Sequence, residues 1–280
     1  MLEQLDLGFL GFGNAIGVYL VDTSDGLALF DCGPATTLPK LRDALDARDL
    51  ALTDLRHLML SHIHLDHAGA AGTLVREHPG LTVWVSEIGA PHLVDPSRLE
   101  ASARRLYGEG FDELWGELAP VPGANLRLAT GEMLGWDVFP APGHASHHVC
   151  YVRDGTLLAG DACGVRVQPS RLVLPVSPPP DIDVEAWHET IDEIARRGPD
   201  RLALIHFGVA TDVDYHLAQL SSELDRWAGL VRSGLDADAF AAAALPDVGD
   251  DLPLYDAIAS IEQSRQGLRR YWIKKRGVEL

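Results

Sequence analysis

The chain has 280 residues, and its 41 acidic and 23 basic side chains give a formal net charge of −18 at pH 7. Hydrophobic residues make up 46% and charged residues 23% of the sequence, a composition typical of a globular protein with a sizeable core. This balance excludes a disordered, collagenous or coiled-coil chain. The negative charge also disfavours a nucleic-acid partner, because it repels phosphate backbones.

The cysteine content and the apolar runs predict the compartment. Three cysteines, Cys32, Cys150 and Cys163, are too few and odd in number for a disulfide framework, which favours a reducing compartment. No apolar run reaches the roughly 18 residues of a transmembrane helix, and Glu3 and Asp6 stand where a signal peptide would be basic. We therefore expect a cytoplasmic protein without a membrane partner. A homodimer is possible.

The first half of the chain alternates short apolar runs with helical patterns. Strands are expected at 15–21, 27–30, 56–60 and 81–85, and helices at 38–50 and 67–78. Segment 87–118 has a mostly helical pattern, which Pro120 and Pro122 close.

The second half continues the alternation and then becomes helical. Strands are expected at 126–129, 133–139, 148–152, 156–159 and 202–205, and a helix at 183–197. The proline-rich segment 175–180 is expected to be extended. From residue 211 onward the pattern is helical, with an interruption around 246–253. Two β-rich halves with helices, followed by a helical tail, indicate a layered α/β domain with an extension.

The segment Ser61-His62-Ile63-His64-Leu65-Asp66-His67 carries the strongest chemical signal. On extended backbone, residues two apart face the same side, so His62, His64 and Asp66 can converge, and His67 opens the following helix. Neutral imidazole and carboxylate are suitable ligands for zinc, iron or manganese. An exposed loop with a chance histidine cluster is disfavoured, because an apolar strand leads into the segment and an apolar helix follows it.

Three other expected strands also end in metal-binding residue types. His144, Asp161 and His206 each follow an apolar run. In α/β architectures, ligands gather beyond the carboxyl ends of strands. Each of these residues alone would more often be an ordinary core or loop residue, but their joint placement favours a metal site. The candidate ligands are His62, His64, Asp66, His67, His144, Asp161 and His206.

The sequence resembles the metallo-β-lactamase superfamily from about residue 14 to residue 206. The resemblance rests on the His-x-His-x-Asp-His segment, Phe30-Asp31-Cys32-Gly33, Pro142-Gly143-His144, Gly160-Asp161 and the late strand-terminal His206. It implies an α/β fold, an αββα sandwich with a C-terminal helical extension. We expect residues 1–210 to form the sandwich, with a helical insertion at about 87–123, and residues 211–280 to form the extension or a lid.

The resemblance also implies a role for each candidate ligand. His62, His64 and His144 would bind a first metal, Asp66, His67 and His206 a second, and Asp161 would bridge both. The implied cofactors are two divalent metal ions, with Zn²⁺ as the first choice and Mn²⁺ or Fe²⁺ as alternatives. His148 would lie near the site outside the ligand set, and Asp31 would be largely structural.

The implied reaction is hydrolysis of a small-molecule thioester, lactone or ester by a metal-bridging hydroxide, which Asp66 would orient. In its ligand set the sequence resembles hydroxyacylglutathione hydrolases and acyl-homoserine lactonases. A phosphodiesterase or nuclease of the same superfamily is the first alternative, which the acidic charge disfavours. An iron-dependent persulfide dioxygenase is the second, since its ligands are a subset of these. A structural or sensory metal site is disfavoured, because seven ligands leave open coordination.

Several residues outside the ligand set have two interpretations. Tyr107, Phe111 and Trp115 lie at helical spacing in the insertion, where packing is favoured over a substrate-pocket wall. Cys163 follows Asp161 closely and is expected to be an inert buried thiol. A solvated helix end is favoured over an anion contact for the basic side chains of the last residues, Arg265, Arg269, Arg270, Lys274, Lys275 and Arg276.

Overall fold

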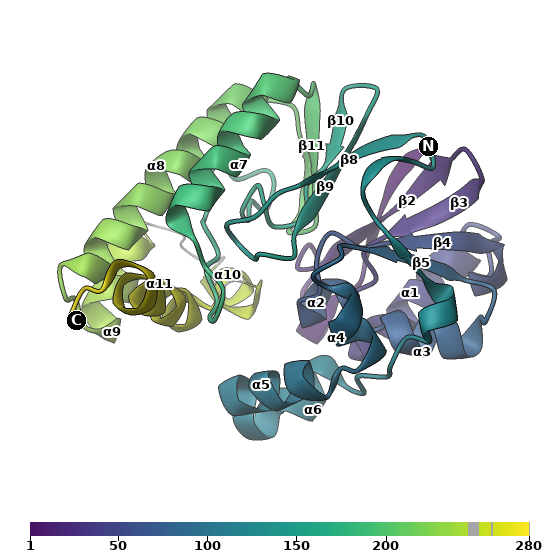
Figure 1. Ribbon diagram of the computed structural model, residues 1–280, viewed down its shortest axis with the longest axis horizontal. Coiled ribbons are helices and arrows are strands. Elements are labelled where there is room, and N and C mark those ends of the chain that lie inside the picture. Colours follow the sequence, from purple (N-terminus) through teal and green to yellow (C-terminus); the bar gives the residue numbers. More distant parts are fainter. Residues whose placement is uncertain (246–251, 259, 280) are drawn as a thin grey trace. The chain divides into compact units, whose positions relative to one another are not determined.

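The computed structural model describes residues 1–245, 252–258 and 260–279. The chain divides into two compact units (Figure 1). Unit 1 comprises residues 1–140 and 147–154, and unit 2 comprises residues 141–146 and 155–280. The expected division into residues 1–210 and 211–280 stays a prediction. Among the described helices, none is both long and apolar enough to cross a membrane.

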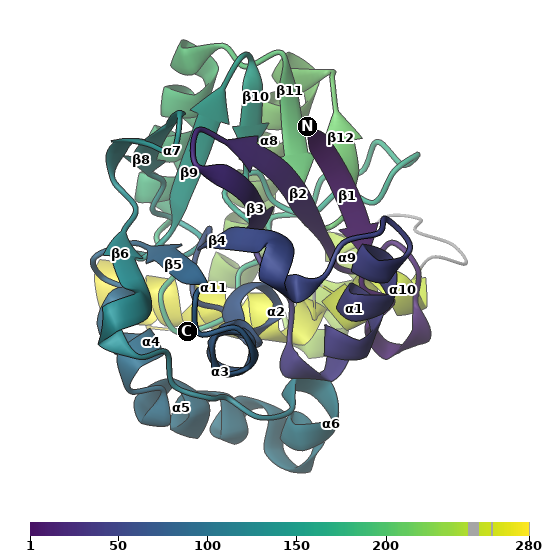
Figure 2. The same cartoon turned by 90° about the vertical axis from the view of Figure 1, so that its right-hand side faces the viewer.

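Unit 1 contains a mixed six-stranded sheet whose strands follow one another in chain order. The strands are β1 (Leu2–Asp6), β2 (Gly17–Thr23), β3 (Gly26–Phe30), β4 (Leu55–Met59), β5 (Thr82–Val85) and β6 (Leu126–Leu128). The first three pair antiparallel and lie side by side in Figure 2, whereas β3 to β6 pair parallel. The last residues of β3 and β4 are buried, which suits parallel strands covered on both faces.

The helices of unit 1 are short. They are α1 (Leu38–Asp46), α2 (Leu65–Ala68), α3 (Ala71–Glu77), α4 (Ala90–Val94), α5 (Ser97–Tyr107) and α6 (Phe111–Trp115). The helix expected at 67–78 is two helices, α2 and α3, with a turn between them at Gly69 and Ala70. Gly72, on α3, meets another segment closely: a Cβ there would lie 1.9 Å from the carbonyl oxygen of Ala119.

Three further strands of unit 1 form antiparallel pairs: β7 (Gly131–Met133), β8 (Trp136–Pro140) and β9 (Val149–Arg153). The single strand expected at 133–139 is therefore β7 and β8. Leu134 and Gly135 separate them with φ angles of 54° and 78°. Positive φ at both central residues makes the tight hairpin turn that matches strand twist, and apolar periodicity alone does not reveal it.

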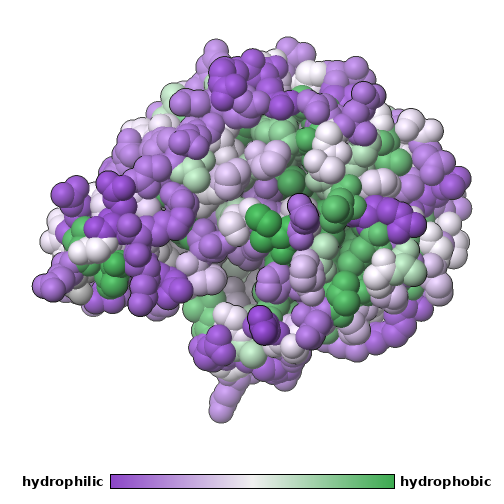
Figure 3. Space-filling view, in the orientation of Figure 1, coloured by the Kyte–Doolittle hydropathy of each residue, from purple (hydrophilic) through white to green (hydrophobic). Residues whose placement is uncertain are grey.

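The helical insertion packs through its aromatic side chains. Trp115 stacks on Phe9 with ring centroids 5.6 Å apart, and Tyr107 meets Trp115 edge-on at 5.0 Å. Phe111 is fully buried beneath the guanidinium of Arg104, which lies 4.1 Å from the ring centroid. The packing interpretation of these aromatic residues is therefore confirmed. On the face shown in Figure 3, apolar residues gather right of the centre, over the part of this unit where Figure 1 draws β4 and β5.

Unit 2 contains β10 (Thr156–Leu158), β11 (Arg201–Leu204) and β12 (Gly208–Ala210), which pair parallel and then antiparallel. Its helices are α7 (Val184–Arg197), α8 (Val213–Arg232), α9 (Ala237–Ala244), α10 (Leu252–Ile258) and α11 (Ile261–Arg276). The interruption expected at 246–253 falls mostly outside the described residues. Asp183 caps α7 by accepting a hydrogen bond from the Ala186 amide, and Gly198 ends it in the left-handed region.

Candidate metal centre

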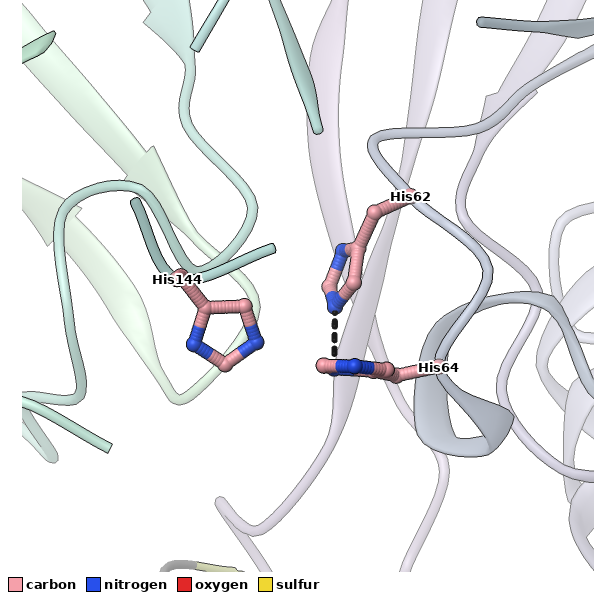
Figure 4. A group of neighbouring side chains, drawn as sticks. All are labelled: His62, His64 and His144. Atoms are coloured by element: carbon pink, nitrogen blue, oxygen red, sulfur yellow. Dashed lines mark hydrogen bonds between the residues drawn. The ribbon is translucent and has the colours of Figure 1, made fainter. Parts of the chain in front are cut away.

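Strand β4 leads directly into the histidine-rich segment of unit 1. After Met59 the chain passes through Ser61 and His62 without regular secondary structure, His64 is extended, and α2 then carries Asp66 and His67. In Figure 4 the ring of His62 points toward that of His64, with an angle of 77° between the ring planes and Nε2 of His62 2.9 Å from Nδ1 of His64. His62 and His67 are fully buried, whereas His64 and Asp66 are partly exposed.

Asp31, directly after β3, fixes the orientation of His67. Its carboxylate oxygen Oδ2 lies 2.8 Å from Nδ1 of His67, and Ser61 donates to the same carboxylate through its amide and its hydroxyl, each at 2.7 Å. Burial raises the pKa of the Asp31 carboxyl, and the neighbouring His67 and Ser61 oppose that shift. With Nδ1 held in this way, Nε2 of His67 lies 3.4 Å from Oδ2 of Asp66.

Two more histidines of unit 1 lie against this cluster. The ring of His148 stacks on that of His62 at 4.8 Å between centroids, and the ring of His147 at 5.9 Å. The carbonyl of His147 accepts a hydrogen bond from the Ser86 hydroxyl at 2.7 Å, which holds that backbone in place. The position of His147 beside His62 was not expected from the sequence. The adjacent pair His147-His148 was the signal that could have indicated it.

Unit 2 brings together the other three candidate ligands. His144 lies in segment 141–146, Asp161 follows β10, and His206 follows β11. Nε2 of His144 lies 3.4 Å from Oδ2 of Asp161, and Nε2 of His206 lies 3.7 Å from Oδ1. All three side chains are buried. Each carboxylate oxygen of Asp161 therefore faces a different imidazole.

The surroundings of His144 select one of its tautomers. Nδ1 of His144 lies 2.8 Å from the Val176 carbonyl oxygen, which can only accept, so Nδ1 carries the proton and Nε2 keeps its lone pair. Trp187 packs edge-on against the His144 ring at 5.6 Å between centroids and donates from its indole to the Ala162 carbonyl. The preceding Gly143 admits no side chain, because a Cβ would lie 2.3 Å from Cα of Trp187.

His206 is held through its own backbone. The Arg166 amide donates to the His206 carbonyl at 2.8 Å, and the Phe207 amide donates to the Arg166 carbonyl at 2.9 Å. The buried guanidinium of Arg166 is paired with Asp212 at 2.6 Å, and that hydrogen bond lowers the pKa of the Asp212 carboxyl. This charge pair fixes the segment from which His206 projects.

The structure thus brings His62, His64, Asp66 and His67 together in unit 1, and His144, Asp161 and His206 together in unit 2. Whether all seven share one centre stays a prediction. Their donor set, five imidazoles and two carboxylates, suits divalent zinc, iron or manganese. The tautomers set by Asp31 and Val176 leave the Nε2 atoms of His67 and His144 as ligand atoms, so these residues fit a metal.

Other residues weighed from the sequence have structural roles. Cys163 is a free buried thiol, as expected, and burial raises its pKa to about 12. In the C-terminal basic group, Lys275 forms an ion pair with Asp183, and Arg276 forms one with Glu185 at 3.2 Å. These two cations are therefore not merely a solvated helix end, because they link α11 to the start of α7.

Comparison with known proteins places the chain in a family. The family model described as the metallo-beta-lactamase superfamily matches residues 13–206. The chain is 28% identical over 155 residues to protein YobT of Bacillus subtilis, an alignment covering 54% of this chain and 63% of that protein. It is 27% identical over 155 residues to the atrochrysone carboxyl ACP thioesterase of Emericella nidulans, covering 53% of this chain and 40% of the thioesterase. The chain therefore spans less than two thirds of these relatives.

A further relative is the hydroxyacylglutathione hydrolase of Salmonella paratyphi A, 29% identical over 108 residues, which are 37% of this chain and 32% of that protein. Among solved structures, the metallo-beta-lactamase superfamily protein ST1585 from Sulfolobus tokodaii superposes with a TM-score of 0.72 at 21% identity. That alignment covers 96% of this chain and 98% of that one. The expected fold is confirmed: two mixed sheets flanked by helices, with further helices at the C-terminus. With the family model spanning most of its length, the chain belongs to the metallo-β-lactamase superfamily.

Proposed function

We propose that this chain is a hydrolase that uses two divalent metal ions to cleave a small-molecule thioester, lactone or ester. The observation that carries the proposal is Asp161, whose two carboxylate oxygens lie 3.4 Å from Nε2 of His144 and 3.7 Å from Nε2 of His206. A buried carboxylate that faces two separate imidazoles is suited to bridging two cations. The superfamily match supports the same reaction class.

The proposed ligands of the first ion are His62, His64 and His144, and those of the second are Asp66, His67 and His206, with Asp161 shared. Two contacts within unit 1 support this assignment. His62 and His64 approach within 2.9 Å through their ring nitrogens, and His67 and Asp66 approach within 3.4 Å.

Bound divalent cations supply Lewis acidity, which polarises a substrate carbonyl and makes a water molecule nucleophilic at neutral pH. The residues of the chain supply orientation. Asp31 holds the proton of His67 on Nδ1, and Val176 holds that of His144 on Nδ1. The Asp66 side chain is 21% exposed whereas His67 is fully buried. We propose that Asp66 accepts a hydrogen bond from the attacking water and thereby orients it.

The proposed substrate is a small molecule, and zinc is the first choice of metal, with manganese and iron as alternatives. Support for a thioester comes from the thioesterase and the hydroxyacylglutathione hydrolase among the relatives. The net charge of −18 disfavours a polyanionic substrate such as nucleic acid.

The experiment is elemental analysis of the protein purified without chelator, followed by an activity panel. The panel contains a thioester, a lactone, a phosphodiester and a persulfide, each assayed after loading with zinc, manganese or iron. We expect two metal ions per chain and turnover of the thioester or the lactone, abolished by chelation and restored by the metal. Selective turnover of the phosphodiester or the persulfide, or activity indifferent to chelation, would overturn the proposal.

A further inference from the structure

Helix α11 packs against the segment of unit 2 that follows Pro175. The amide of Ser177 donates to the hydroxyl of Ser264 at 3.2 Å, and both side chains are fully buried. One helical turn later, α11 touches the same residue with its backbone. A Cβ at Gly267 would lie 1.9 Å from the Ser177 carbonyl oxygen, so only glycine permits this approach.

Further polar contacts join α11 to later residues of the same segment. Arg270 donates from Nε to the Pro180 carbonyl at 3.1 Å, and Lys275 forms an ion pair with Asp183. The hydroxyl of Tyr271 donates to Glu185 at 2.6 Å. Successive turns of α11 therefore hold the chain from Ser177 to the first turn of α7.

The same segment holds the loop that carries His144. The Val176 carbonyl accepts from Nδ1 of His144 at 2.8 Å. The Asp183 amide donates to the Gly143 carbonyl at 2.9 Å, and the Asp181 carboxylate accepts from the Ser146 amide at 2.9 Å. The loop is thus fixed at Gly143, at the His144 imidazole and at Ser146.

We propose that α11 positions His144 for metal binding through this relay. Ser264 and Gly267 fix Ser177, which fixes the neighbouring Val176 carbonyl, and that carbonyl keeps the proton on Nδ1 so that Nε2 faces Asp161. The inference rests on the proposed function, because it takes His144 as a ligand. It goes beyond it, because α11 (Ile261–Arg276) follows the residues matched by the family model.

The expected consequence is a selective loss of metal affinity. Outer partners that orient a ligating histidine contribute about 10–100-fold to metal affinity. Disturbing Ser264 or Gly267 should weaken the ion held by His144 by that factor. The ion that does not depend on His144 should keep its affinity.

The first test is Gly267→Ala, with Gly229→Ala as the matched control. Both glycines lie inside helices, but a Cβ at Gly229 would meet nothing within 4 Å. Zinc is titrated against a chromophoric chelator at a temperature well below unfolding. We expect Gly267→Ala to bind one of two zinc ions at least about tenfold more weakly, and Gly229→Ala to bind both like the wild type.

A second variant tests the same inference in case Gly267→Ala fails to fold. Ser264→Ala removes the acceptor of the Ser177 amide, and Ser222→Ala, on the exposed side of α8, is its control. Nitrogen-15 NMR of labelled histidines reports the tautomer of His144, whose signal is identified by its loss in His144→Gln. We expect a dominant Nδ1-protonated tautomer in the wild type and a tautomer mixture in Ser264→Ala.

The outcomes separate this inference from the proposed function. If wild-type protein binds no metal, the proposed function fails, and the tautomer measurement still decides whether α11 orients His144. If both α11 variants lose thermal stability but keep wild-type zinc affinity and the wild-type His144 tautomer, α11 is only structural and the inference is wrong.

Discussion

Nδ1 of His67 lies 2.8 Å from Oδ2 of Asp31, and both side chains are completely buried. A carboxylate can only accept this hydrogen bond, so the proton of His67 stays on Nδ1 and Nε2 is available as a ligand atom. Asp31 itself has a φ of 56°, in the left-handed region that few residues other than glycine adopt. Backbone strain of this kind is often retained at functional sites.

Asp31→Asn tests this relationship. The carboxamide can donate to Nδ1 of His67 and would then favour the tautomer with the proton on Nε2, which cannot bind metal. We expect zinc affinity to fall by about 10–100-fold, measured by chelator competition. The control is Asp154→Asn in an exposed turn, where the side chain is 92% exposed. Unchanged zinc affinity in Asp31→Asn would show that the buried contact serves only the fold.

Asp161→Asn tests the shared ligand. The carboxamide offers one oxygen and one NH₂ group, and the NH₂ group repels a cation that the second carboxylate oxygen would bind. We expect the variant to retain fewer metal ions than the wild type and to lose most activity, as measured by elemental analysis and by turnover. Asp192→Asn on the exposed face of α7 is the control. Wild-type metal content in Asp161→Asn would contradict a bridging role.

Gly72→Ala tests the packing beneath the metal-ligand segment. A Cβ at Gly72 would lie 1.9 Å from the Ala119 carbonyl oxygen, so the backbone must shift. Overpacking of this kind costs about 1–3 kcal/mol of the free energy of unfolding. Gly229→Ala has open space and should instead stabilise the protein by up to about 1 kcal/mol, because alanine is the better helix former. Urea unfolding of both variants measures the difference, and equal stabilities would refute the close approach.

The buried His216 makes stability depend on pH. Its Nε2 donates to the Cys163 carbonyl at 2.7 Å, and burial lowers its pKa from 6.5 to about 4. The unfolded chain therefore binds this proton first as the pH falls. The contribution of His216 is complete above the unfolded pKa and is lost between pH 6.5 and about pH 4.

Between about pH 7 and about pH 5, we expect His216 to account for a loss of about 2 kcal/mol in the free energy of unfolding. His216→Gln can keep a donor to Cys163 but does not titrate, so urea unfolding should show a smaller loss in this variant. The wild-type protein, unfolded under the same conditions, is the reference. Equal pH dependence in His216→Gln and the wild type would contradict the assignment.

The sequence predicted the strands that carry the site because those strands are short buried apolar runs. The expected strands at 56–60 and 202–205 correspond to β4 and β11, each within one residue at either end. It did not predict β1, in which Glu3 and Gln4 separate the two leucines, or β12, which has only three residues. It also merged β7 with β8, because the turn at Leu134 depends on backbone dihedral angles and not on polarity.

For the candidate site, sequence spacing indicated the ligand types but not what orients them. Val176 lies 32 residues from His144, and Ser61 lies 30 residues from Asp31. No periodicity relates such positions, because these contacts depend on tertiary folding. The backbone contact at Gly267 was likewise unpredictable, since a glycine within a helical pattern resembles any weak helix position.

The two compact units are interleaved along the polypeptide. Unit 1 resumes at residue 147 after the segment 141–146, and unit 2 resumes at residue 155. No single cut can therefore release either unit as one uninterrupted fragment. During synthesis, the first unit lacks β9 until the ribosome has passed residue 154, when the opening segment of the second unit has already been made. Nascent chains should thus acquire protease resistance late, and not in two separate steps as independently folding domains do.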